Sequence, residues 1–155
     1  MPVAPLLSLP PTFECPQGRF WLFDDTATAL DQITLDAMND EAAAFLTGAF
    51  QFAINTRYVW KGRKVRYIHD WRACGAYSTN AREKLIEWGR QGHSMTAETI
   101  IALSPSSSAF VRIAVATAMM VMKGLRMKID VRESLDDVVS ELSRSTPVSA
   151  EALRR

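Results

Sequence analysis

The chain has few cysteines, no excess of charge of either sign and no long uninterrupted hydrophobic run. Its 155 residues include two cysteines, and 18 basic side chains nearly balance 17 acidic ones, for a net charge of +1. Cys15 and Cys74 lie far apart in the sequence, which argues against a disulfide scaffold and favours a reduced, cytoplasmic protein. The small net charge provides no general field that would attract nucleic acid or a membrane, so we expect neither as a partner.

Segments that could cross a membrane or direct export are also lacking. The longest apolar run, Ala109 to Met122, is short and is interrupted by Arg112, so it does not predict a membrane span. Residues 1–11 are apolar, but they contain four prolines and no basic residue, unlike a signal peptide. We expect an extended arm over 1–11, packed on its own domain or on a partner subunit, one domain over 12–144, and a polar tail over 145–155.

The second half of the chain alternates strand and helix three times. The predicted strand–helix pairs are 65–68 with 81–89, 99–103 with 108–123, and 127–131 with 135–142. Such alternation predicts parallel strands joined by helical crossovers. The loops after these strands would meet at one edge of the sheet, where open α/β folds bind their ligands.

The first half of the chain predicts a hairpin followed by a helix. Apolar runs at 12–15 and 19–23 flank a turn that contains Gly18, which indicates a β-hairpin. The polar segment 26–34 predicts a loop, and Thr34 can cap a helix after it. The helix would bury one stripe, formed by Leu35, Met38, Ala42, Phe45, Leu46 and Ala49. Residues 55–64 fit a helix end or a strand, and we favour a helix end and loop before a strand from about 64 to 68.

The segment 69–80 joins the first strand of the alternation to its helix and contains the most chemically active side chains. His69 and Asp70 are adjacent at a strand end, so they point to opposite faces and cannot act together in a catalytic triad. Cys74 lies among small residues, which predicts a buried, unreactive thiol. Ser78, Thr79 and Asn80 are good helix caps, with Asn80 three residues before Glu83 as in a capping box. No His or Cys spacing predicts a metal site, and we expect no cofactor.

The order hairpin, helix and three strand–helix units resembles the STAS domain, the fold of bacterial anti-sigma-factor antagonists, over about 12–144. In that family the matching loop carries Asp-Ser-Ser-Gly, with a phosphorylatable serine at the helix start. Here Ser78 stands at the aspartate position, Thr79 at the serine position and Asn80 at the glycine position. The wider segment is similar to divergent, uncharacterised STAS-like proteins of bacteria. The resemblance implies an α/β fold, a mixed sheet covered by helices, with Ser78 and Thr79 as candidate regulatory phosphorylation sites.

Two surfaces are candidates for partner binding. One gathers the ends of neighbouring strands and comprises Asp70, Trp71, Arg72, Tyr77, Ser104 and Ser106. The serines at 104–108 lack the glycine and lysine of a phosphate-binding P-loop, so nucleotide binding is not favoured. The other is the helix over 108–123, which is apolar nearly all round and would expose an apolar face. Its candidate interface residues are Phe110, Val111, Val115, Met119, Met120 and Met122.

A basic cluster with interleaved aromatics lies between the two halves of the chain, at Arg57, Lys61, Arg63, Lys64 and Arg66. Such a pattern can bind single-stranded nucleic acid, but the overall charge favours a solvated loop anchored by its aromatics.

These observations favour a non-catalytic, cytoplasmic bacterial module that binds a protein partner or itself as a homo-oligomer. The alternative is a carrier of a small apolar, lipid-like ligand, because the STAS fold resembles part of the CRAL-TRIO lipid-binding fold. An enzyme using the loop 69–79 is a third reading. A cavity lined by Phe45, Met119 and Met122 would favour the carrier, and a flat apolar helix face would favour the interaction module. A polar cleft where His69 and Cys74 converge would favour the enzyme.

Overall fold

The computed structural model describes residues 9–104, 109–136 and 138, which form a mixed six-stranded sheet covered by helices. The strand order is β1-β2-β3-β5-β7-β8. The strands are β1 (Phe13–Cys15), β2 (Gly18–Phe23), β3 (Thr28–Ile33), β5 (Val65–Asp70), β7 (Thr96–Ala102) and β8 (Ile129–Arg132). The first two pairs are antiparallel, and β3, β5, β7 and β8 are parallel. The predicted α/β class, hairpin and parallel strands are therefore confirmed.

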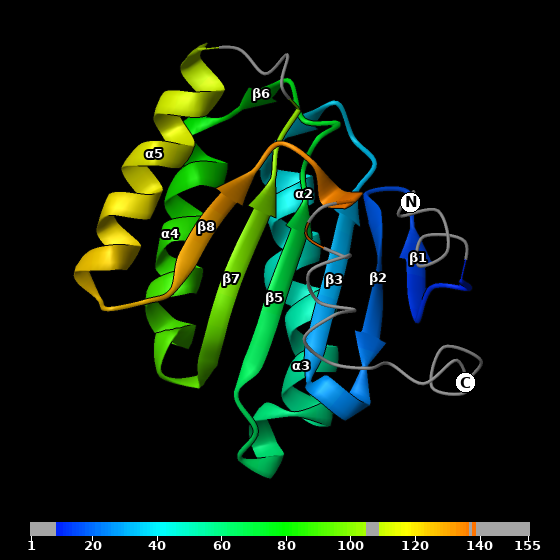
Figure 1. Cartoon of the computed structure of the whole chain (residues 1–155). Helices are drawn as coiled ribbons and strands as arrows, with labels where there is room; N and C mark the ends of the chain where they lie inside the picture. Colours follow the sequence, from blue (N-terminus) through cyan, green and yellow to red (C-terminus); the bar gives the residue numbers. More distant parts are fainter. Residues whose placement is uncertain (1–8, 105–108, 137, 139–155) are drawn as a thin grey trace.

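The helices that connect the strands of the described part pack on one face of the sheet, as Figure 1 shows. They are α2 (Asp40–Phe45), the π turn η2 (Leu46–Phe50), α3 (Gln51–Arg57), α4 (Thr79–Gly92) and α5 (Ala109–Gly124). Short 3₁₀ turns are η1 (Asp24–Thr26), η3 (Val59–Lys61) and η4 (His93–Met95). Parallel strands that follow one another in sequence order, joined by right-handed crossovers, place every connecting helix on the same face.

The prediction of a loop over 26–34 is wrong, because β3 occupies Thr28–Ile33 in the centre of the sheet. This strand is buried on both faces, so it lacks the polar–apolar alternation of a half-exposed strand. Asp31 and Gln32 give it a polar composition, yet Asp31 has no exposed surface. Polar side chains from distant parts of the sequence bond to Asp31 and Gln32, and these bonds allow a polar segment to form a central strand.

The first helix starts later than predicted. Thr34 does not cap it; its hydroxyl donates to the Pro16 carbonyl, and Asn39 accepts from the Ala42 amide at the true N-terminus. The short strand β4 (Ala37–Met38) precedes the helix and pairs in parallel with β6 (Ala76–Tyr77). The π turn then inserts one extra residue per turn, so Phe50 faces the sheet and the predicted Ala49 is exposed.

The three strand–helix units are present with shifted ends. The helix predicted over 81–89 begins earlier, because Ser78 rather than Asn80 is the N-cap and accepts from the Ala81 amide. Residues 55–64 form a helix end and a 3₁₀ turn, as favoured from the sequence. Of the last predicted helix, 135, 136 and 138 are helical, and the remainder lies outside the described residues.

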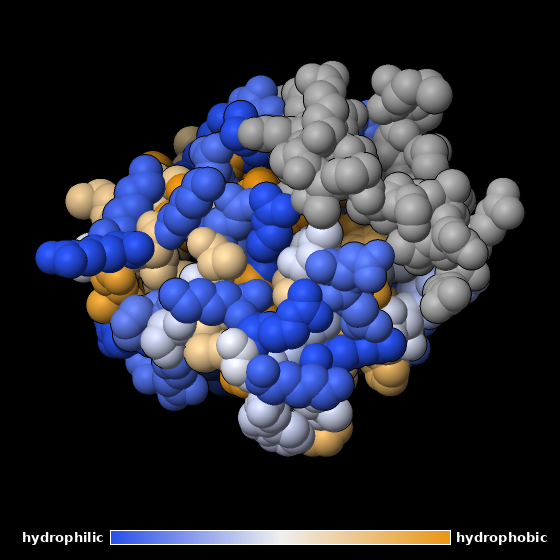
Figure 2. All heavy atoms as spheres, turned by 60° about the horizontal axis from the view of Figure 1, so that its bottom comes forward, coloured by the Kyte–Doolittle hydropathy of each residue, from blue (hydrophilic) through white to orange (hydrophobic). Residues whose placement is uncertain are grey.

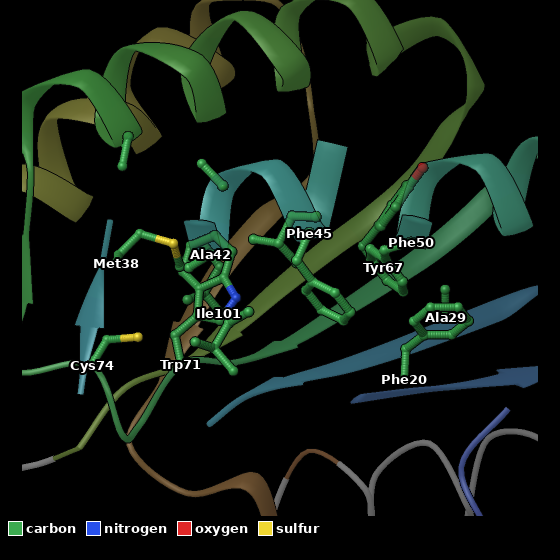
Figure 3. Packing of buried hydrophobic residues seen from close by; sticks show 14 of the residues in the cluster. Phe20, Ala29, Met38, Ala42, Phe45, Phe50, Tyr67, Trp71, Cys74 and Ile101 are labelled. Atoms are coloured by element: carbon green, nitrogen blue, oxygen red, sulfur yellow. The ribbon is translucent and has the colours of Figure 1, made fainter. Parts of the chain in front are cut away.

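The two faces of the sheet carry separate apolar clusters. On the helix side, Phe20, Phe45, Phe50 and Tyr67 pack together with Trp71, as Figure 3 shows. The opposite face is smaller and is covered by chain ends: Leu9, Leu135 and Val138 pack on a patch formed by Trp21, Leu30, Ile68, Ile100 and Ala102. The Leu9 carbonyl also accepts from the Trp21 indole at 2.9 Å, so the last residues of the predicted arm lie on their own domain.

The surface at the end of the molecule where β5 and β7 begin is largely hydrophilic, with apolar residues scattered over it (Figure 2). Within the described ranges, no helix has both the length and the hydropathy needed to cross a membrane.

The hairpin leaves no room for a side chain at Gly18. A Cβ there would lie 2.6 Å from the Gln32 carbonyl oxygen and 3.0 Å from the Phe45 ring. We expect Gly18→Ala to lower the free energy of unfolding by about 1–3 kcal/mol through overpacking, measured by chemical denaturation. Gly48→Ala is the matched control, because nothing lies within 4 Å of its Cβ position. It should be neutral or stabilising, and an equal loss in both variants would contradict this account.

Candidate functional site

A buried polar network joins the two central strands β3 and β5. Asp31 and His69 are paired in register across these strands, and the Asp31 carboxylate contacts Nδ1 of His69. The second carboxylate oxygen accepts from the Trp71 indole N–H at 3.0 Å. Burial raises the pKa of the Asp31 carboxyl, while its contacts with His69 and Trp71 act in the opposite direction. The network is therefore an internal polar contact that fixes the orientation of two aromatic rings.

Asp70 points to the other face of the sheet, as the strand alternation predicts. Its carboxylate accepts from Arg72 through both Nε and Nη2, at 2.8 and 3.0 Å, and from Gln32 at 2.9 Å. Gln32 in turn accepts from Nε of Arg19 at 2.7 Å. His69 and Asp70 thus belong to two separate networks, and the acidic partner of His69 comes from a neighbouring strand.

Tyr67 and His69 of β5, with Trp71 directly after this strand, form an aromatic row on the helix side of the sheet. The His69 ring stacks on Trp71 with centroids 4.7 Å apart and on Tyr67 at 5.7 Å. Trp88 of α4 lies against the same row, 5.6 Å from the His69 ring. Gln51 accepts from both the Tyr67 hydroxyl and the Trp88 indole, at 3.0 and 2.8 Å. The Tyr67 hydroxyl, the Trp71 and Trp88 indoles and Nδ1 of His69 each have a hydrogen-bond partner within the domain, which fixes the orientation of the rings.

A cavity of about 90 Å³ lies between this aromatic row and helices α4 and α5. Its walls are mostly aromatic and aliphatic. The aromatic residues are Tyr67, His69, Trp71 and Trp88, and the aliphatic ones are Leu85, Ile86, Ile101, Ala114, Val115, Ala118, Met122, Met127 and Ile129. Three residues were predicted to line the cavity of a carrier. Of these, Met122 lines this cavity, whereas Phe45 and Met119 do not. This volume is below the roughly 150 Å³ of a cavity that binds benzene, so any molecule held wholly inside it would be small.

Three polar side chains that line the cavity have hydrogen-bond donors or acceptors that no described residue engages. The Tyr77 hydroxyl is the one buried side-chain oxygen or nitrogen, within the described ranges, that has no hydrogen-bond partner. Burial, followed by the nearby Cys74 and Asp31, raises the Tyr77 pKa, so its hydroxyl stays protonated and remains a donor. Nε2 of His69 and the guanidinium of Arg82 form no hydrogen bond or ion pair with a described residue.

Cys74 is buried, as predicted, and does not converge with His69. Its thiol lies 3.8 Å from the Leu35 carbonyl oxygen, to which it donates. Burial raises the pKa of the thiol to about 12, with neighbouring aspartates adding to the effect. A thiol of this pKa is almost wholly protonated at neutral pH and is a poor nucleophile.

Ser78 and Thr79 are exposed and line a shallow hollow at the N-terminal ends of α2 and α4. The hollow also includes Asp40 and Glu41, and Lys84 pairs with Asp40 at 3.6 Å. A phosphate on Ser78 or Thr79 would therefore lie beside two carboxylates, which opposes the helix-terminal attraction for an anion.

Most of the other predicted surface residues are buried or bonded. Trp71 and Tyr77 turn to the helix side of the sheet, which contradicts their assignment to the strand-end surface. Asp70 is buried, and it shares a shallow strand-end hollow with Arg72, Ser104 and Glu133. Ser106 lies outside the described residues.

The predicted interface on α5 is corrected in a similar way. Val111, Val115 and Met122 are buried in the core, and Met119 packs partly against it, so the helix uses these side chains internally. Met120 remains exposed, at 76%, together with Ile113 at 63%. The side chain of Phe110 is not among those described.

Asp31, Trp88 and Arg82 were not identified from the sequence. Asp31 lay in a segment taken for a loop, although one acidic residue between Leu30 and Ile33 was a signal of a buried partner. Trp88 and Arg82 fall within the helix predicted over 81–89, and only the packing of α4 on β5 brings them to the cavity.

The described ranges contain no group of three or more His, Cys, Asp or Glu placed to hold a metal ion. In comparisons with protein-family models, curated proteins and solved structures, the chain has no match.

The Asp31 network predicts how substitutions of this residue behave. Asp31→Ala leaves the His69 and Trp71 ring nitrogens without their buried partner, so we expect a loss of about 2–5 kcal/mol in unfolding free energy. Asp31→Asn should restore most of it, because its amide oxygen can accept from Trp71 and its amide nitrogen can donate to His69. Urea denaturation measures both. Asp36→Ala, at an exposed aspartate, should stay within about 0.5 kcal/mol of the parent; a similar loss there would contradict the network's role.

Proposed function

We propose that this chain is a non-catalytic binding module with a STAS-like α/β fold, which holds a small, mainly apolar ligand between its sheet and helices α4 and α5. The observation that carries the proposal is the cavity of about 90 Å³ with aromatic and aliphatic walls. Ligand sites of this type are mostly apolar, with a few polar groups that orient the ligand. Here those groups are His69, Tyr77 and Arg82.

The arrangement around His69 supports a binding role over a catalytic one. Nδ1 is engaged by Asp31, and the nearby thiol of Cys74 donates to the Leu35 carbonyl instead of to the ring. The pKa of about 12 for this thiol also removes the nucleophile of the third sequence-based reading. We therefore expect the His69 ring to form part of the cavity wall.

The test is binding of 1-butanol, a small neutral probe, followed by tryptophan fluorescence, since Trp71 and Trp88 line the cavity. We expect a saturable change in the tryptophan emission of the parent protein. Ala118→Leu fills the cavity and should weaken binding at least about tenfold. Ala116→Leu places the same side chain on the exposed face of α5 and should leave binding unchanged. Absence of saturable binding, or equal affinity in both variants, would overturn the proposal.

A second candidate function is self-association through the outer face of α5. Ile113, Ala116 and Met120 are exposed and are spaced by three and four residues, so they form one apolar stripe along the helix. A stripe with two large exposed hydrophobic side chains is typical of a contact surface, and methionine adapts readily to a partner. This keeps the predicted homo-oligomer, with a different set of contact residues.

For self-association, light scattering at tens of micromolar should give a molar mass above that of one chain. Met120→Glu should reduce it to the monomer value, because a carboxylate cannot be buried in an apolar contact without a partner. Phe52→Glu is the control, since Phe52 is 66% exposed on α3, away from the stripe. A monomeric parent protein would rule this candidate out.

A further inference from the structure

The cavity is elongated along α4. Six residues of this helix line it, at Arg82, Leu85, Ile86, Trp88, Gly89 and Gly92, and they lie on one side of the helix. The ten steps from Arg82 to Gly92 correspond to a rise of about 15 Å along the helix axis. A ligand that fills this space is therefore longer than it is wide.

The middle and far end of the cavity are apolar and narrow. Gly89 allows α4 to lie close to α5, since a Cβ there would be 2.8 Å from the Met122 sulfur. Met122, Met127 and Ile129 continue the apolar wall toward Gly92. The polar atoms at this end are already satisfied: the Thr96 hydroxyl donates to the Gly92 carbonyl at 2.8 Å. This part of the cavity suits an aliphatic chain.

The opposite end holds two donors without protein acceptors. Tyr77 lies in β6, just before α4, and Arg82 lies in the first turns of α4. The Tyr77 hydroxyl is buried without a partner, and the partly buried Arg82 guanidinium forms no bond with a described side chain or carbonyl. Both are donors, and the N-terminal end of the 14-residue α4 adds a positive potential. Among the described residues, no aspartate or glutamate lines the cavity.

We propose that the ligand is an amphipathic monocarboxylate, whose carboxylate is bound by Arg82 and Tyr77 and whose aliphatic chain lies along α4. This inference rests on the proposed ligand-binding function and adds the chemical class of the ligand. The absence of acidic residues from the cavity lining disfavours a cationic ligand. One arginine and one hydroxyl match the two oxygens of a carboxylate, since a guanidinium binds a carboxylate through two parallel hydrogen bonds. A neutral ligand would provide no counter-charge for the Arg82 guanidinium.

The test compares butanoate with 1-butanol, which has the same number of carbons and a neutral head, by isothermal titration calorimetry on the full chain. We expect butanoate to bind at least about tenfold more tightly than 1-butanol. Arg82→Gln should remove this preference, because it lowers butanoate affinity much more than 1-butanol affinity, and Tyr77→Phe should lower butanoate affinity several-fold. Arg90→Gln is the matched control, since Arg90 lies on the same helix, is exposed and pairs with Glu87. Melting temperatures confirm that each variant is folded.

Equal affinities for butanoate and 1-butanol in the parent protein would overturn the carboxylate assignment and leave the proposed apolar site standing. The same holds if Arg82→Gln and Arg90→Gln weaken butanoate binding equally, because the effect is then one of general charge. If Ala118→Leu leaves butanoate binding unchanged, the ligand binds elsewhere, and both the proposed function and this inference are wrong.

Discussion

The structure depends on a buried aspartate at the centre of its sheet. Asp31 has no exposed surface, and its two oxygens contact His69 and Trp71 from the next strand and the loop that follows it. A buried carboxylate without partners would cost several kcal/mol, so this position is compatible with one register of β3 against β5. Shifting the register by one residue would turn Asp31 toward the apolar patch on the opposite face.

The same network shapes the cavity wall. Asp31 contacts the ring nitrogens of His69 and Trp71 and fixes the orientation of both rings. The rings therefore stay stacked in one row with Tyr67 and do not fill the cavity beside α4. Core packing normally fills such space, and empty volume lowers stability. The retention of a cavity beside this aromatic row is the physical basis for proposing a binding role for this part of the molecule.

Different parts of the chain cover the two faces of the sheet, and the topology explains why. Strands added in sequence order toward one edge send all their crossover helices to one face, so the other face is left to the ends of the chain. Leu9, Leu135 and Val138 cover it, and Trp21 is bonded to the Leu9 carbonyl. The helix face therefore carries the cavity and the candidate ligand groups, while the opposite face is closed by short terminal segments.

The sequence by itself determined the α/β class, the hairpin and the three strand–helix units, because these depend on local patterns of apolar spacing, caps and turns. It also determined that His69 and Asp70 point to opposite faces, which follows from strand geometry. It could not determine that Thr28–Ile33 is a central strand, since the burial of Asp31 depends on a histidine 38 residues away.

The proposed binding site, too, was decided by tertiary structure. Tyr77, Arg82 and Trp88 meet His69 only because α4 packs on β5 and β7, and no local pattern encodes that meeting. The π turn in the first helix, which replaces Ala49 by Phe50 in the core, has the same origin: packing against the sheet selected it over a regular helix. Local propensity defined the elements, and the complementarity of distant side chains decided which residues face one another.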